Sequence, residues 1–231
     1  MKKLLLLVVS VMFVGTLVAQ NDLATFGLKG NVTKLIQKGS DDNMNDSFEC
    51  EWMTHNNFTF SKTGKLVGVG DSVVGFEPFE DYNQNVFYQE YFKIPDDYGY
   101  PTWYYITRDK QNRITSVTFE APGGDGDIID TFLYDEKGRV QEVMESFVYV
   151  GWGYEGEEGV GKKTNGYNIK YFYDENDNVT KAVKYDAYEK KTHTVTFAYK
   201  EFDAAGNWTK RVANCPTRMI NNQVETRVLS Y

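Results

Sequence analysis

A short turn motif that recurs along the chain constrains the fold more than any other feature of the sequence. Each copy begins with Asp or Ser, has Gly, Asn or Asp three residues later, and is flanked by alternating apolar residues. Asp and Ser favour the first position of a type I turn, and the fourth position of such a hairpin needs a left-handed backbone that Gly, Asn and Asp tolerate. The motif therefore predicts β-hairpins. The copies lie at 58–69, 106–117, 132–143, 173–186 and 201–212.

The motif positions can be assigned residue by residue. The first position is Ser61, Asp109, Asp135, Asp174 and Asp203, and the fourth is Gly64, Asn112, Gly138, Asp177 and Gly206. Successive copies are unevenly spaced, so the repeat is degenerate and not a strict solenoid. No convincing amphipathic helix of three turns is visible. We expect an all-β fold, an antiparallel meander of repeated hairpins that forms an elongated twisted sheet, an open barrel or a sandwich.

Residues 173–186 (YDENDNVTKAVKYD) also suggest a calcium loop, because Asp174, Asn176 and Asn178 alternate. Such a loop wants Gly at its sixth position and Glu at its twelfth, where this chain has Val179 and Tyr185. The stretch 124–130 (GDGDIID) is a second weak candidate. The hairpin interpretation is favoured, and we expect no metal site.

Three glycosylation sequons recur at the same phase of the repeat. They begin at Asn31, Asn178 and Asn207. The Asn follows the turn and the Thr belongs to the returning strand, so turn and strand propensities produce the pattern without any glycan.

The segments YDEKGRV, YDENDNV and FDAAGNW resemble the tyrosine–aspartate repeats of the RHS family, in which YDxxGN or YDxxGR marks each unit. The stretch LATFGLKGNVTKL is similar to the start of small exported repeat proteins of Bacteroidota. The resemblance covers most of 27–213, but only two copies carry a true Tyr-Asp. In large RHS proteins these units spiral into a shell around a toxin, for which this chain is too short. The resemblance implies repeated hairpins in an exported protein and implies no reaction.

The N-terminus has the layout of a secretory signal peptide. Lys2 and Lys3 precede an apolar run of about 15 residues, which is shorter than the roughly 20 needed to span a membrane. We expect cleavage after Ala19, leaving 20–231 as a single all-β repeat domain. The protein would then be periplasmic, on the outer surface or secreted, with no membrane insertion after cleavage. An uncleaved N-terminal anchor is the alternative.

The net charge argues against nucleic acid as a partner, and the two cysteines suggest a possible disulfide. Without residues 1–19 the chain has 23 basic and 33 acidic residues, a net charge of −10. Such a chain is a poor partner for nucleic acid. Cys50 and Cys215 are the only cysteines, and in an exported protein they are a possible disulfide. We expect no cofactor, and the oligomeric state is left open.

A search for catalytic residues favours a non-catalytic protein. Ser72 lies in a Gly-Asp-Ser block, but neither His55 nor His193 follows an Asp as a serine esterase of that type requires. We expect His193 to face outward beside Thr194. Acidic pairs are abundant, so a carboxylate-dependent hydrolase can be neither excluded nor located.

Aromatic clusters beside glycines are the remaining candidate ligand-binding feature. They lie at 98–105 (YGYPTWYY) and 149–154 (YVGWGY). Flat exposed rings in loops can stack on a sugar or anchor a protein partner. The predicted ligand-binding residues are Trp103, Tyr105, Trp152 and Tyr154. The alternative is that these rings belong to the core.

Three functions follow from these observations. The first is an exported, non-catalytic cell-envelope protein that acts as a binding or assembly module for glycan or an envelope protein. The second is a secreted hydrolase with two carboxylates in a cleft. The third is a structural protein that pairs with a partner through an edge strand.

Overall fold

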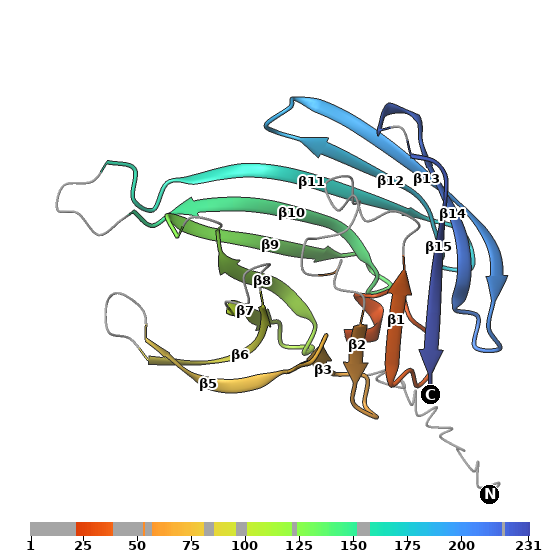
Figure 1. Ribbon diagram of the computed structural model, residues 1–231, viewed down its shortest axis with the longest axis horizontal. Helices are drawn as coiled ribbons and strands as arrows, with labels where there is room; N and C mark the ends of the chain where they lie inside the picture. Colours follow the sequence, from red (N-terminus) through yellow and green to blue (C-terminus); the bar gives the residue numbers. More distant parts are fainter. Residues whose placement is uncertain are drawn as a thin grey trace, which may run out of the picture.

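The computed structural model describes residues 22–38, 53, 57–80, 86–95, 101–121, 124–151, 158–218 and 220–231. In these residues 15 antiparallel strands form one sheet that curls into a nearly closed barrel (Figure 1). The predicted all-β meander of hairpins is confirmed. Helical structure includes two short 3-10 helices, η1 (Asp22–Ala24) and η4 (Pro216–Arg218). No helix in this part of the chain is long and apolar enough to cross a membrane.

The strands follow one another around the barrel almost in chain order. From β5 to β15 each strand pairs with the next, and β15 then pairs with β1, which is followed by β2, β3 and β4. The strands are β1 (Lys34–Lys38), β2 (Asn57–Phe60), β3 (Leu66–Val69), β4 (Ser72–Val73), β5 (Gly75–Glu80), β6 (Val86–Pro95), β7 (Pro101–Arg108), β8 (Ile114–Glu120), β9 (Gly126–Tyr134), β10 (Val140–Tyr149), β11 (Lys163–Tyr173), β12 (Val179–Asp186), β13 (Lys191–Phe202), β14 (Trp208–Cys215) and β15 (Ile220–Ser230).

The seam of the barrel lies between two strands that are consecutive in the chain. The end strands of the sheet, β4 and β5, are separated by one residue, Val74. β5 pairs with β6, and Ser72 on β4 also reaches β6, because its hydroxyl oxygen accepts the backbone N–H of Lys93 at 2.9 Å. The stretch from β4 to β5 therefore bridges the two ends of the sheet.

The five motif hairpins have the geometry that turn chemistry requires. In the β7–β8 turn the carboxylate of Asp109 accepts the backbone N–H groups of Gln111 and Arg113, each at 2.9 Å. Ser61, Asp135, Asp174 and Asp203 accept the equivalent pair of N–H groups in the other four turns. The fourth-position residues have positive φ values: Gly64 78°, Asn112 65°, Gly138 80°, Asp177 63° and Gly206 81°.

Tyrosines of the motif connect successive hairpins. The hydroxyl of Tyr134 donates to the backbone carbonyl of Ile114 at 2.6 Å, and the guanidinium of Arg113 lies 4.5 Å from the centre of the same ring. Each hairpin therefore holds the aromatic ring of the next one. The same hydroxyl contact recurs between Tyr173 and Val140 and between Tyr199 and Val179.

Alternate connections of an antiparallel meander lie at the same end of the sheet, so the five motif turns gather at one end of the barrel, the turn end. The N-terminal segment 22–32 covers this end from within and is buried at Leu23, Phe26, Leu28 and Val32. The ring of Phe26 packs 4.7 Å from that of Phe58. The side chain of Asn207 both accepts from the backbone N–H of Lys29 at 2.6 Å and donates to its carbonyl at 2.9 Å. Asn207 is 2% exposed and cannot carry a glycan in the folded protein.

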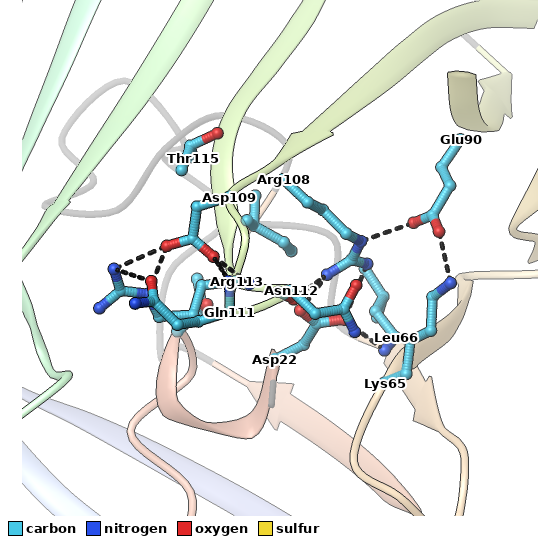
Figure 2. A network of polar contacts seen from close by, with 12 residues as sticks. Asp22, Lys65, Leu66, Glu90, Arg108, Asp109, Gln111, Asn112, Arg113 and Thr115 are labelled. Carbon is cyan, nitrogen blue, oxygen red and sulfur yellow. Dashed lines mark hydrogen bonds and ion pairs between the residues drawn. The ribbon is translucent and has the colours of Figure 1, made fainter. Parts of the chain in front are cut away.

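A buried ion-pair network fixes this segment beside the seam (Figure 2). Asp22, 1% exposed, accepts the backbone N–H of Leu66 at 2.6 Å and pairs with the guanidinium of Arg108. Arg108 also donates to Glu90 at 2.7 Å, and Glu90 pairs with Lys65. Burial by itself would raise the pKa of Glu90, but the hydrogen bonds from Lys65 and Arg108 outweigh burial and lower that pKa. The network thus joins β3, β6 and β7 to the N-terminal segment.

The inward face is mostly apolar but also carries charged groups. Trp208 on β14 is buried, and two guanidinium groups lie over its ring, with Arg211 at 4.2 Å and Arg227 at 3.9 Å from the ring centre. His193 also points inward, so the expectation that it faces outward is wrong. Strand alternation explains this, because His193 has the same phase as the buried Val195 two residues later.

Candidate functional site

Trp103 and Tyr105 lie on the outward face of β7, inside the strand and not in a loop as the sequence suggested. The residues that alternate with them, Tyr104 and Ile106, are buried in the core. Tyr91, on the neighbouring strand β6, is the cross-strand partner of Tyr105. We call Tyr91, Trp103 and Tyr105 the aromatic ladder.

The three rings of the aromatic ladder form a continuous row. Trp103 lies 5.0 Å from Tyr91 between ring centres, at an interplanar angle of 33°. Tyr105 lies 6.3 Å from Trp103 at 14°, so these two rings are almost parallel. The ammonium group of Lys93 lies 3.5 Å from the centre of the Trp103 ring and 5.6 Å from that of Tyr91. The row thus has one cationic group over its central ring.

The inner faces of the same strands hold the ladder in place. Phe92 and Tyr104 stack at 5.0 Å with an interplanar angle of 2°, and Phe119 lies 4.8 Å from Tyr104. A side chain at Gly75, opposite Tyr91 on β5, would meet the Tyr91 ring at 2.8 Å. Glycine therefore leaves the space that this ring occupies.

Hydroxyl-bearing side chains lie beside the Tyr105 end of the ladder. Thr118 on β8 pairs directly with Tyr105, and Ser116 pairs with Thr107. Gln89 donates to the Thr107 hydroxyl at 3.4 Å. A flat aromatic row beside hydroxyl, amide and ammonium groups can stack against an apolar ring face and hydrogen-bond to its substituents.

Other predicted residues are not brought to this site. Trp152, Tyr154 and Cys50 lie outside the described residues, so their roles stay predictions. Cys215 is buried and forms no disulfide within the described residues, and its sulfur lies 3.4 Å from the Thr217 hydroxyl; the possible disulfide with Cys50 stays a prediction. Ser72, the weak nucleophile candidate, accepts a backbone N–H at the seam.

One acidic pair lies inside the barrel. Asp130 on β9 and Glu145 on β10 are direct cross-strand partners, and the hydroxyl of Tyr167 donates to Asp130 at 3.1 Å. Asp130 is fully buried. A hydrolase needs two carboxylates that a substrate can reach, which this arrangement does not provide. The sequence placed Asp130 only in the weak calcium candidate 124–130 and did not single out Glu145, although Asp130 stands in phase with Phe132 on its strand.

Metal-binding side chains do not converge in the described ranges, where no group of three or more His, Cys, Asp or Glu residues could hold an ion. In the stretch 124–130, residues 126–130 form the start of β9. Asp130 lies on the inward face, and Asp127 pairs with Glu120 on β8 and with Val148 on β10. Burial and the nearby Glu120 charge raise the pKa of Asp127.

Comparisons with known proteins find structural similarity but no related sequence family. No protein-family model matches the chain, so the resemblance to RHS repeats has no support from that side. No curated protein matches it either. Among solved structures, a porin-like protein from Bacteroides vulgatus is similar with a TM-score of 0.44 and 13% identity, over 87% of this chain and 98% of that one. A porin-like protein from Bacteroides uniformis gives 0.42 and 10%, over 88% and 99%.

Proposed function

We propose that this protein is an exported, non-catalytic module of the cell envelope that binds a glycan through the aromatic ladder. The observation that carries the proposal is the outward, nearly parallel pair Trp103 and Tyr105, at 14° and 6.3 Å. The inner stack of Phe92 and Tyr104 makes this pair a rigid platform, so little conformational freedom is lost when a ligand binds.

The chemistry of the surroundings favours a sugar over an apolar peptide. Thr118, Thr107 and Gln89 offer hydrogen-bond donors and acceptors at the edge of the ladder. Lys93 covers the Trp103 ring, which is half-buried, and a cation over such a ring contributes about 1 kcal/mol. A ligand can therefore displace the ammonium group at small cost, and the ammonium group can then bind a ligand oxygen.

Export rests on the signal-peptide layout of residues 1–19, which lies outside the described residues and remains a prediction. Apolar side chains fill the interior of the barrel, while the outward positions of β11 to β14 combine exposed rings, such as Phe172 and Tyr185, with Lys170, Lys181, Thr194 and Lys210.

The test is a glycan array on residues 20–231, followed by calorimetric titration of the best ligand. Trp103→Ala should weaken binding at least tenfold, which corresponds to about 1.4 kcal/mol. Phe172→Ala is a matched control, because Phe172 is also an outward ring with a lysine, Lys181, 3.9 Å from its centre. Equal losses in both variants, or no ligand on the array with both variants folded, would contradict the proposal. In the second case a pull-down from envelope extracts would test a protein ligand.

The alternative functions have less support in the described residues. Edge-strand pairing needs a long bare edge, but β4 has two residues and β5 contains Pro78, which cannot donate a backbone hydrogen bond. The hydrolase needs an accessible pair of carboxylates, and Asp130 is fully buried.

A further inference from the structure

A hollow lies at the barrel end opposite the motif turns. It has a volume of about 510 Å³, within the range of small-ligand sites, and is open to solvent. The turn between β12 and β13 forms one side, and η4, which connects β14 to β15, forms the other. The described residues that line it are Glu189, Lys191, Thr192, His193 and Thr217.

His193 is the unusual member of this set, because it is 4% exposed and only half of its hydrogen-bonding capacity is used. Its Nδ1 lies 3.0 Å from the hydroxyl oxygen of Thr217. Its Nε2 is buried and has no hydrogen-bond partner in the described part of the chain. The nearest acid is Glu189, whose carboxylate oxygen lies 3.8 Å from Nε2, too far for a hydrogen bond. A buried polar atom without a hydrogen-bond partner costs free energy, so we expect a ligand atom to bind beside Nε2.

The Thr217 hydroxyl sets the direction of the hydrogen bonds. Thr217 has one proton to donate, either to His193 Nδ1 or to the sulfur of Cys215 at 3.4 Å. A nitrogen lone pair is a much better acceptor than a thiol sulfur. When Thr217 donates to Nδ1, the neutral imidazole carries its proton on Nε2. That proton points toward Glu189, and the ring presents a donor on the Glu189 side of the hollow.

The charged groups of the hollow balance one another. Lys191 lies 3.6 Å from the Glu189 carboxylate, and both side chains are well exposed. The negative charge of Glu189 disfavours binding of an anion, and the positive charge of Lys191 disfavours binding of a metal cation. A hydroxyl group suits both, because it can accept from Nε2–H and donate to Glu189. The side chain of Glu189 is 43% exposed and sits on a turn, so it can make the small movement that admits such an oxygen.

We propose that this hollow is a second ligand site, specific for vicinal hydroxyl groups of the kind that a saccharide or polyol presents. His193 Nε2–H and Lys191 donate to ligand oxygens, Glu189 accepts from a ligand hydroxyl, and Thr217 fixes the imidazole. The site is separate from the aromatic ladder and does not depend on it.

Imidazole nitrogen resonances offer a direct test, since the chain has two histidines, His55 and His193. Protein labelled with ¹⁵N-histidine is titrated with methyl hexopyranosides, and a His55→Gln variant assigns the signals. We expect the Nε2-protonated tautomer of His193 and a saturable shift of its signal at millimolar ligand. Glu189→Ala should weaken this binding about fivefold or more. Trp103→Ala should leave it unchanged, which separates this site from the aromatic ladder.

Three results would overturn the proposal. The first is a His193 signal that does not move at tens of millimolar glycoside. The second is a stronger response to inorganic phosphate or to Zn²⁺ than to any glycoside, which would indicate an anion or metal site. The third is binding that persists unchanged in Glu189→Ala, with the fold of the variant verified by circular dichroism.

Discussion

The hydroxyl of Tyr173 donates a 2.6 Å hydrogen bond to the backbone carbonyl of Val140, and Arg139 lies 4.2 Å over the same ring. Tyr173 ends β11, directly before the first turn position Asp174, and Val140 begins the returning strand of the previous hairpin. The Tyr and Arg of the motif therefore make contacts between successive hairpins. Its Asp and Gly stabilise the turn within one hairpin.

Removing the hydroxyl of Tyr173 should weaken this connection. Tyr173→Phe leaves the ring in place and removes only the donor, so we expect a loss of about 1–2 kcal/mol in the free energy of unfolding. Urea denaturation measures it. Tyr185→Phe is the control, because Tyr185 is 47% exposed on the outward face. A loss of similar size in the control would show that the Val140 contact is unimportant.

The connecting tyrosines should also resist ionisation. Burial raises the pKa of Tyr134 to about 12, and burial likewise raises the pKa of Tyr173 and Tyr199. Because these pKa values lie above the unfolded value of 10.0, the stability they contribute is complete below pH 10 and is lost as the pH rises toward 12. An ultraviolet titration should show two phases, the second coinciding with unfolding. A single phase near pH 10 in the folded protein would contradict the buried contacts.

Acid should destabilise the barrel through the network at the seam. The folded pKa of Glu90 lies below its ordinary value of 4.5, so its contribution is present above pH 4.5 and is lost as the pH falls through the folded pKa. Glu90→Gln should lower the free energy of unfolding at pH 7 by about 1–3 kcal/mol. It should also make that free energy fall less steeply as the pH drops below 4.5. Glu136→Gln, on an exposed turn residue, serves as the control and should change neither.

The fourth turn position offers an internal comparison. Gly138 has a φ of 80°, and Asn112 and Asp177 have similar positive φ values at the same position of two other motif hairpins. Gly138→Ala should cost about 1–2 kcal/mol, since a β-carbon is strained there, and Gly138→Asn should cost less. Conversely, Asn112→Gly should be neutral or stabilising. Thermal unfolding of the three variants tests the order, and an Ala variant as stable as the Asn variant would refute the explanation.

Lys93 should regulate access to the aromatic ladder. Lys93→Ala removes the ammonium group over Trp103 and exposes the ring face, so neutral glycans that only stack should bind up to about fivefold more tightly. Glycans that use the ammonium group should bind more weakly. Calorimetry on one ligand of each kind, with Lys181→Ala as the control, distinguishes these effects; no change with either ligand would place the binding site elsewhere.

The turns could be predicted from the sequence because their chemistry is local. Asp109, Asn112 and Gly138 occupy positions that only a few residue types can hold. Barrel closure could not be predicted in this way, because the contact of Asp22 with Arg108 joins residues 86 positions apart and leaves no local pattern.

The site was only partly visible in the sequence. Trp103 and Tyr105 were chosen because glycines stand nearby, but alternation with the buried Tyr104 is what places them outward. The same alternation places His193 inward with Val195 on β13. Tyr91 and Lys93 were missed because cross-strand pairing, which sequence does not reveal, brings them to Trp103.

Strand β1 pairs with β15 from Lys34 opposite Ser230 to Lys38 opposite Thr226. The hydroxyl of Tyr231 bonds Asp203 and Asn207, and Asn207 holds Lys29. Strand β1 is synthesised well before β15, so it cannot complete its pairing until β15 is available. Hairpins can form as they appear, but this closing step joins residues such as Gln37 and Arg227, 190 positions apart, and pairing over such a separation slows folding. Until β15 has paired, the apolar inner faces of the strands are exposed to water and prone to aggregation.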